Sequence, residues 1–154
     1  MLFRSLTTWR EHVFSPEGLG TDWIGGDIHI LASSGGGTVG HIGFDVYTLI
    51  MDGAESKCIG VGAVVVIPAY QGQHVPKRMF NALREWRDEQ HPGIPLALFC
   101  PDSLVSYYRK HDFTATAGEV FYQQKGDYQR SKFAFMTDQP VDDKSRIYIP
   151  SNPW

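Results

Sequence analysis

The chain of 154 residues lacks an excess of basic residues, a cysteine framework and a long apolar run. Its 14 Lys and Arg residues face 17 Asp and Glu residues, so the formal net charge is −3 and nucleic acid is a poor default partner. Cys58 and Cys100 form no CxxC motif and are too few for a disulfide scaffold. No segment reaches the roughly 18 apolar residues that cross a bilayer, and the first residues contain no apolar run long enough for a signal peptide. We therefore expect a cytoplasmic protein without a membrane or nucleic-acid partner.

Two common catalytic signatures are also missing. The six histidines show neither HxxxH nor HExxH spacing, so we expect no metal site. Ser103 and Ser106 lack the GxSxG context of a hydrolase nucleophile. Both cysteines lie in apolar surroundings, where a thiol most often serves as a small hydrophobe.

The composition that is present fits one compact domain over residues 1–154, since 42% of the residues are hydrophobic and 13% are aromatic. Two strands at 27–34 and 38–53, separated by the glycine turn 35–37, are predicted to form an antiparallel hairpin. The apolar, β-branched run 56–67 predicts a buried strand near the centre of a sheet. Helical periodicity over 75–90 and a strand at 94–100 then predict a βαβ unit with two parallel strands.

Shorter elements complete the expected order. Residues 8–14 are predicted to form a short helix, and Asp102 is predicted to cap a helix over 103–110. Strands at 118–124 and 131–137, joined by a polar turn, are predicted to pair as a final hairpin. The expected fold class is α+β, with a mixed and mostly antiparallel sheet, a central parallel strand pair and flanking helices.

The loop between the central strand and its helix carries the first family signature. Residues 64–83, VVVIPAYQGQHVPKRMFNAL, resemble the acyl-CoA signature of the GCN5-related N-acetyltransferases (GNAT superfamily). The matching positions are Pro68, Tyr70, Gln71 and Gly72. His74 and Pro76 stand where the family usually has small residues.

A second block, SLVSYYRKHDF at 103–113, resembles a later helix of the same family. That helix carries an aromatic–tyrosine pair, a basic residue and a final Gly-Phe. The matching positions are Tyr107, Tyr108, Lys110 and Phe113, and Asp112 replaces the glycine. The element order agrees over residues 27–137, so the resemblance extends beyond the two blocks.

The resemblance implies that acetyl-CoA is the co-substrate, held between the two parallel strands and at the N-terminus of the following helix. The residues expected to contact it are Val64, Val65, Val66, Gln71, Gly72, Gln73, His74, Val75, Pro76 and Lys77. Pro76 is expected at the first helical position, where its ring is well accommodated but donates no hydrogen bond. We expect this to weaken cofactor binding by about 1–2 kcal/mol relative to a full set of N–H donors.

The resemblance also implies a catalytic role for Tyr108, which would protonate the departing thiolate. A purely packed role for this tyrosine is the alternative. Gly62 stands where many family members have a glutamate base. His41 and Asp45 alternate onto one face of the preceding strand and are candidates for the acceptor groove, although an ordinary sheet histidine is the favoured interpretation of His41. The sequence identifies no general base.

A narrower resemblance concerns the acceptor side. The features that carry it are DWIGGDIHIL at 22–31, His41, Cys58, Asp142, Asp143 and the final Trp154. They resemble the aminoglycoside 2′-N-acetyltransferases, in which an acidic groove and a C-terminal tryptophan meet a polyamine sugar. This resemblance implies that Asp22 and Trp154 contact the acceptor.

The expected function is therefore acetyl-CoA-dependent N-acetylation of a primary amine, by direct attack of the amine on the thioester. The acceptor is a small-molecule amine or a protein amine. The alternative is a catalytically degenerate acyl-CoA-binding or regulatory module of the same fold. The sequence leaves open a longer acyl donor and a homodimer formed through the C-terminal strands.

Overall fold

The computed structural model describes residues 20–154, so the helix expected at residues 8–14 lies outside the described part. The strands are β1 (Ile28–Ser34), β2 (Gly37–Met51), β3 (Ala54–Val66), β4 (Leu96–Cys100), β5 (Thr114–Ala115), β6 (Glu119–Gln124), β7 (Asp127–Arg130), β8 (Ala134–Thr137) and β9 (Arg146–Ile149). The helices are α2 (Val75–Gln90) and α3 (Val105–Arg109), and the 3₁₀ turns are η2 (Pro68–Tyr70) and η3 (Asp102–Leu104).

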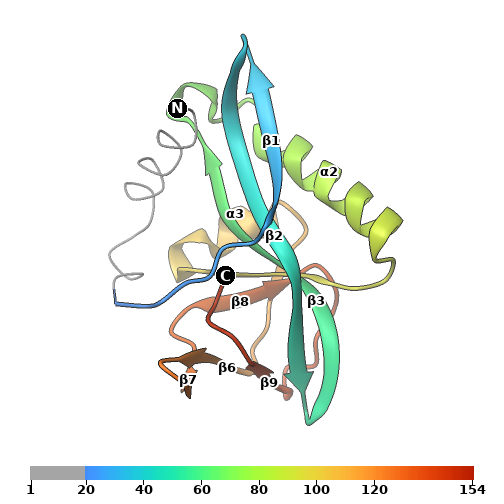
Figure 1. Cartoon of the computed structure of the whole chain (residues 1–154), viewed down its shortest axis with the longest axis vertical. Coiled ribbons are helices and arrows are strands. Elements are labelled where there is room, and N and C mark those ends of the chain that lie inside the picture. Colours follow the sequence, from blue (N-terminus) through green and yellow to red (C-terminus); the bar gives the residue numbers. More distant parts are fainter. Residues whose placement is uncertain (1–19) are drawn as a thin grey trace.

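The described strands form one mixed sheet in the order β5-β8-β4-β3-β2-β9-β6-β7, and β1 pairs with β2 outside that path (Figure 1). The hairpin of β1 and β2 and the parallel pair of β3 and β4 were both predicted. The α+β fold class, with a mostly antiparallel sheet and a central parallel pair, is confirmed.

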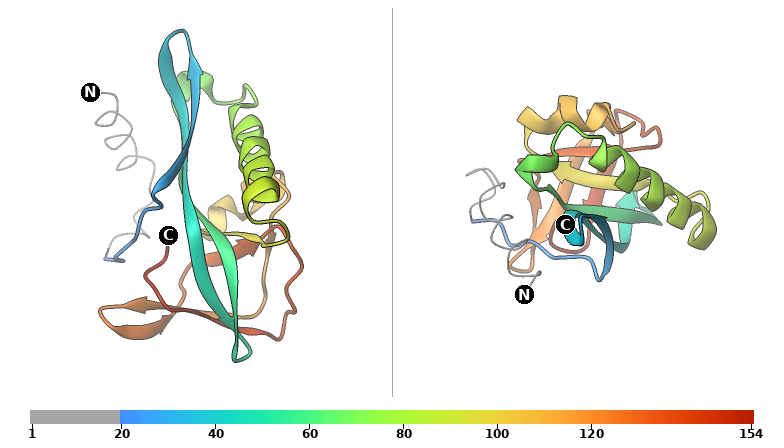
Figure 2. Two further views of the ribbon diagram at one scale, coloured as in Figure 1. Left: turned by 45° about the vertical axis from the view of Figure 1, so that its right-hand side comes forward. Right: turned by 90° about the horizontal axis from the view of Figure 1, so that it is seen from above.

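Helix α2 covers one face of the sheet where β1, β2 and β3 run side by side. Its apolar positions Val75, Met79, Phe80 and Leu83 are buried, as the helical periodicity predicted. They pack in one cluster with residues of β2, β3, β4 and α3, such as Phe44. Figure 2 shows α2 on one side of the long strands and the C-terminus on the other. The other face of β2 and β3 is therefore not covered by this helix.

The end of α2 is tied to the start of β4 by a nearly buried carboxylate. Asp138 has a side chain only 6% exposed, and its Oδ2 accepts a hydrogen bond from the guanidinium of Arg87. Its Oδ1 accepts a hydrogen bond from the N–H of Leu96 at 2.8 Å. Both carboxylate oxygens are thus paired, and the helix end is fixed against the strand that follows it.

On the face of β2 and β3 opposite α2, the last residues of the chain lie close to the strand backbone. Gly60 and Gly62 remove two side chains from this face, and Trp154 lies there with 4% exposure. Its indole stacks on the ring of Tyr47 at 4.4 Å and 7°, and its N–H donates to the carbonyl of Ala97 at 3.2 Å. A Cβ on Gly60 would stand 2.4 Å from both rings.

Strands β3 and β4 pair over a short distance and then separate. The parallel ladder joins Ile59, Gly60 and Val61 to β4, whereas β3 stays paired with β2 as far as Val66. The β2–β3 register shifts at this point, because Ile42 of β2 faces two residues of β3, Ala63 and Val64. Ala63 lies in this bulge with φ +49°, in the left-handed region that alanine seldom adopts.

The predicted final hairpin is wrong. Strand β8 pairs with β4 and β5, while β6 pairs with β7 and, in parallel, with β9. Lys125 and Gly126, both at positive φ, turn the chain so that the polar stretch after them becomes β7. All residues of β7 are exposed, so no apolar alternation marked it as a strand. The buried residues Phe135 and Met136 place β8 against β4 instead.

The helix expected over 103–110 is shorter and begins differently. Asp102 belongs to the first turn of η3, which Pro101 precedes, and no side chain caps that turn. The α-helical part is α3 alone. Asp112, which stands in place of the family's glycine after this helix, adopts the left-handed conformation with φ +66°.

Replacing Gly60 by alanine tests the contact between β3 and Trp154. Because the added methyl group meets two packed rings, we expect Gly60→Ala to lower the free energy of unfolding by about 1–3 kcal/mol. Gly25→Ala is the matched control, since nothing lies within 4 Å of its Cβ position, and we expect a change within about 0.5 kcal/mol. Urea unfolding measures both variants, and equal stability of the two would contradict this packing.

Candidate active site

The loop from β3 to α2 has an unusual backbone. After η2 the chain passes Gly72 at φ +77° and His74 at φ +62°, and α2 begins directly after His74. Residues 71–74 form a hydrogen-bonded turn, and the first main-chain hydrogen bond of α2 runs from the N–H of Arg78 to the carbonyl of His74, so the helix itself offers no partner to the N–H groups of Val75 and Lys77. These groups stand at a helix N-terminus, where the macrodipole is positive. The loop therefore offers an anion several donors at the carboxyl end of a central strand.

Two glutamine side chains hold the loop from behind. Gln71 donates through Nε2 to the carbonyl of Val66 at 3.2 Å, and Gln73 donates to the carbonyl of Ala69 at 3.0 Å. Both contacts use side-chain amides and main-chain oxygens of the preceding segment. They fix the path of the loop without using the N–H groups of Gly72 and His74.

Two details of the predicted loop need correction. The N–H of Gln71 is not available to a ligand, because it donates to the carbonyl of Pro68 at 3.2 Å and completes η2. Pro76 is the second helical residue and not the first, since His74 is the N-cap and Val75 the first helical residue. The positive φ of His74 explains this difference from the prediction, because it directs the chain into α2 so that Val75, and not Pro76, is the first helical residue.

The remaining predicted cofactor residues lie along one path. Val65 and Val66 are buried, Val64 is half-buried, and all three lie on β3 beyond its last pair with β4. Lys77 is exposed in the first turn of α2, next to the exposed Arg78. This path runs from the separating strands to the N-terminus of α2.

Tyr108 lies at the end of α3, 8% exposed, in the core cluster that also contains Cys100 of β4. Its ring meets Phe80 edge-on at 6.3 Å and Phe113 at 6.1 Å. Burial, and then the neighbouring Tyr107 and Cys100, raise the pKa of the Tyr108 phenol. The phenol stays protonated at neutral pH, so it can only donate its proton. Its packing and its availability as an acid are compatible.

The predicted acceptor residues divide into two places. Asp45 and Trp154 lie with His41 on the face of β2 and β3 that α2 does not cover. Asp45 accepts the N–H of Val46 at 2.8 Å and that of Asp27 at 3.4 Å. Asp22 is exposed and is fixed at β6 through its main chain, which exchanges hydrogen bonds with the Gln124 amide at 2.8 and 2.9 Å.

Three further residues of this face were missed from the sequence. Ala63 bends β3, His29 contacts His41, and Tyr47 carries the stacked Trp154. No sequence signal reveals a left-handed alanine. The register of the β1–β2 hairpin, however, places His29 diagonally beside His41, and this register follows from a turn at Gly35 and Gly36.

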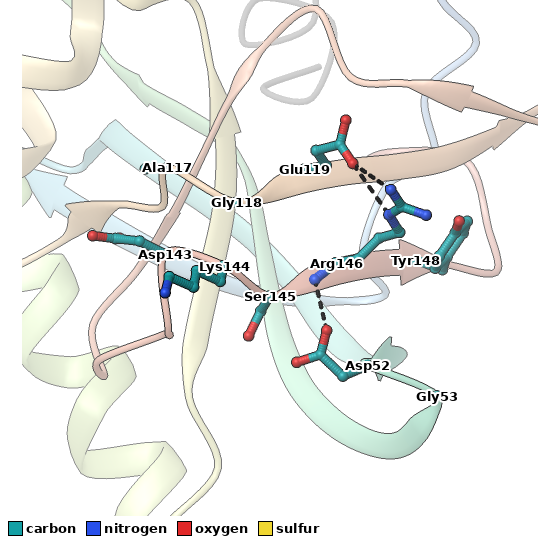
Figure 3. A pocket seen from close by; sticks show the side chains of 10 residues that line it. All are labelled: Asp52, Gly53, Ala117, Gly118, Glu119, Asp143, Lys144, Ser145, Arg146 and Tyr148. Carbon is teal, nitrogen blue, oxygen red and sulfur yellow. Dashed lines mark hydrogen bonds and ion pairs between the residues drawn. The ribbon is translucent and has the colours of Figure 1, made fainter.

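A cavity among the described residues borders the loop. A groove of about 290 Å³ between the β1–β2 hairpin and α2 is lined in part by Tyr70, Gln73 and Arg78. A second cavity, of about 570 Å³, lies between the β2–β3 turn, the segment before β6 and the start of β9 (Figure 3). There the guanidinium of Arg146 donates a hydrogen bond to the carboxylate of Glu119 at 2.8 Å, and the main-chain N–H of Arg146 donates to the carboxylate of Asp52 at 2.8 Å. The second cavity contains none of the predicted site residues.

In residues 20–154, no cluster of three or more His, Cys, Asp or Glu side chains is arranged to hold a metal ion. Within the same range, no helix is long and apolar enough to cross a membrane.

Comparison with known proteins identifies the family. A family model described as an acetyltransferase (GNAT) domain matches residues 21–116, which is more than half of the chain. The chain therefore belongs to the GNAT acetyltransferase family. A search of curated proteins finds no match.

Solved structures show the same fold. Escherichia coli ElaA is 20% identical with a TM-score of 0.57, and the alignment covers 89% of each chain. An acyl-CoA N-acyltransferase from Pseudomonas aeruginosa is 17% identical with a TM-score of 0.56, again over 89% of each chain. A GNAT family acetyltransferase from Brucella melitensis, solved in complex with acetyl-CoA, is 21% identical with a TM-score of 0.53, over 95% of this chain and 86% of that chain.

The strained backbone of His74 gives a test of the loop. We expect His74→Gly to raise the free energy of unfolding by about 0.5–1 kcal/mol, because relief of about 1–2 kcal/mol of left-handed strain is partly offset by the entropy of glycine. His74→Ala is the control, since alanine keeps the strain and should give no gain. Thermal unfolding compares the three proteins, and a gain with alanine would contradict this explanation.

The two cysteines give a second test. Burial raises the pKa of Cys58 to about 12, and burial together with Asp102 raises that of Cys100 to about 12. We expect neither thiol to react with a disulfide reagent in the native protein at about pH 8, because the thiolate is the reactive form. Both should react in guanidinium chloride. A native thiol that reacts rapidly would show that one of these strands is open.

Proposed function

We propose that this protein transfers the acetyl group of acetyl-CoA to a primary amine. The observation that carries the proposal is the loop after β3, which leads directly into the N-terminus of α2, where the first N–H groups of the helix have no partner within the helix. A pyrophosphate is the part of acetyl-CoA that suits such donors. The exposed side chains of Lys77 and Arg78 add positive charge beside it.

The separation of β3 from β4 provides the place for the rest of the donor. A pantetheine arm is an extended chain with two amides, and it suits the edge of β3 from Val64 to Val66, which β4 leaves unpaired. The thioester then lies near the bulge at Ala63. The loop and the separated strands lie in continuous sequence, so one ligand can contact both.

The chemistry requires no covalent enzyme intermediate. The neutral amine attacks the thioester carbonyl, and a backbone N–H near Val65 stabilises the oxygen that becomes negative. The C–S bond breaks, the nitrogen loses a proton, and the leaving thiolate receives the phenolic proton of Tyr108. Because burial raises the pKa of Tyr108, its phenol holds the proton at neutral pH until the thiolate forms.

The acceptor is proposed to approach from the face of β2 and β3 that α2 leaves uncovered. Asp45 offers negative charge there, and Tyr47 and Trp154 offer aromatic surface. Such a site suits a cationic small-molecule amine or a protein amine. The roles of Asp22 and Trp154 implied by the aminoglycoside 2′-N-acetyltransferases stay predictions. A catalytically degenerate acyl-CoA-binding module is the competing proposal, favoured by the absence of a side chain at Gly62.

Binding and turnover separate these proposals. Isothermal titration with acetyl-CoA measures donor binding, and thiol release measures transfer to phenethylamine, spermidine, kanamycin and a lysine-containing peptide. Binding with turnover of at least one amine supports the transferase. Binding without turnover of any amine favours the module, and no binding would contradict both proposals.

Tyr108→Phe tests the general acid. We expect kcat to fall by about 100-fold or more, with little change in the dissociation constant of acetyl-CoA, because the phenol acts on the leaving thiolate. Tyr107→Phe is the matched control, since Tyr107 is the neighbouring half-buried tyrosine and is expected to keep its activity. Unchanged turnover of Tyr108→Phe would remove this assignment.

A further inference from the structure

The helix that carries Tyr108 ends in a Schellman motif. The N–H of Phe113 donates to the carbonyl of Tyr108 at 3.2 Å, and the N–H of Asp112 donates to the carbonyl of Arg109 at 3.2 Å. Asp112 has φ +66°, the left-handed conformation that this motif requires. The ring of Phe113 meets that of Tyr108 edge-on at 6.1 Å, which is the apolar contact that often accompanies the motif. The position of Tyr108 is therefore coupled to the turn after α3.

This turn lacks the residue that would form it most easily. Asp112 stands where the family usually has glycine, which adopts the left-handed conformation freely. Aspartate adopts it only at a cost, because it carries a Cβ. The carbonyl of His111, the residue before Asp112, accepts neither of the two main-chain bonds of the motif. The turn therefore has a strained residue and a carbonyl that can accept a bond from outside α3.

Arg84 of α2 supplies that bond. Its guanidinium donates to the carbonyl of His111, and its Nε lies 3.9 Å from Oδ2 of Asp138. Asp138 is the carboxylate that fixes the end of α2 to the start of β4. Only 20% of the Arg84 side chain is exposed, and a planar guanidinium with several N–H donors can make both contacts at once. One side chain thus joins the end of α3 to α2 and β4.

Arg84 also contacts two of the rings that surround Tyr108. Its guanidinium carbon lies 5.9 Å from the centroid of the Phe80 ring and 5.5 Å from that of the Phe113 ring. Both rings meet the ring of Tyr108 edge-on, and they meet each other at 5.5 Å. Arg84 therefore acts on the position of Tyr108 through the turn and through these two rings.

We propose that Arg84 is a positioning residue for Tyr108: it holds the turn after α3 and so fixes where the phenol lies relative to the leaving sulfur. This inference rests on the proposed amine acetylation. The proton still passes from the phenol of Tyr108 to the thiolate, and Arg84 takes no part in that transfer. Because proton transfer needs the two heavy atoms within hydrogen-bond reach, a displacement of about 1 Å slows such a step by up to about 100-fold.

Arg84→Met tests this role, because methionine keeps much of the apolar packing and removes the hydrogen bond and the charge. With the best amine of the panel above, we expect kcat to fall by about 10-fold, while the dissociation constant of acetyl-CoA changes by less than about twofold. An unchanged kcat would overturn the proposal.

Arg87→Met is the matched control. Arg87 lies one turn further along α2 and binds the same Asp138 carboxylate, but its guanidinium pairs with Asp88 and Asp138 and not with the turn after α3. We expect Arg87→Met to lower the free energy of unfolding and to leave kcat within about twofold of the wild type. An equal fall of kcat in Arg84→Met and Arg87→Met would overturn the proposal, since both variants would then act through Asp138.

A double-mutant cycle separates positioning from a general loss of structure. If Arg84 acts through the phenol of Tyr108, it has little effect once that phenol has been removed. In a protein that already carries Tyr108→Phe, we therefore expect Arg84→Met to lower kcat by less than about twofold. A further loss of about 10-fold in that background would show that Arg84 acts elsewhere, and would overturn the proposal.

Asp112→Gly provides a rescue experiment. Because glycine adopts the φ of +66° freely, the turn should form without help from the guanidinium. We expect the combination of Arg84→Met and Asp112→Gly to restore kcat to within about threefold of the wild type. No recovery in this combination would contradict a role that passes through the turn.

Amide hydrogen exchange gives a readout that needs no turnover. The N–H groups of Asp112 and Phe113 should exchange at least about 10-fold faster in Arg84→Met than in the wild type or in Arg87→Met, because their hydrogen bonds form the turn. Equal protection in all three proteins would overturn the proposal.

The outcomes separate this inference from the proposed function. If the wild type binds acetyl-CoA but acetylates no amine, the proposed function fails, and this inference fails with it. If the wild type is active, Tyr108→Phe is slow and only the Arg84 results differ from expectation, the positioning role alone is refuted.

Discussion

The separation of β3 from β4 is the constraint on which the rest of this molecule depends. The two strands are parallel neighbours at Gly60 and Val61, and then β3 bends at Ala63 while remaining attached to β2. The separation leaves an edge of β3 beside the start of α2, and α3 follows the end of β4. The proposed donor site lies along this opening. A regular strand through Ala63 would move the carbonyl that fixes His41.

The two faces of β2 and β3 differ in the size of their side chains and therefore in what packs against them. Large apolar residues such as Phe44 and Val61 face α2 and form the core. On the other face, Gly60 and Gly62 have no side chains, and Trp154 packs directly against the backbone there. Because that packing occupies the space at Gly62, a base at this position would compete with it.

Much of the fold could be predicted because its signals are local. The hairpin of β1 and β2, the buried strand β3, the helix α2 and the parallel strand β4 each carry a clear period or run. The pairing of β8 with β4 could not be predicted in this way, since β7 has no apolar face and the choice among partners is made by burial. In the candidate site, the loop proposed to bind the donor was predicted from its sequence signature. Its backbone was not, because the left-handed φ of His74 is unusual for a histidine and leaves no local signal.

The sequence by itself determined the family, the element order around the donor loop and the candidates Tyr108 and His41, because motifs and periodicity are properties of neighbouring residues. Only the tertiary structure decided that His29 joins His41, that Ala63 supplies their anchor and that Trp154 fills the place beside Gly62. These contacts join β1, β2, β3 and the last residue, which are far apart in the chain. They depend on strand register and on a single bulge, and neither is encoded in any one segment.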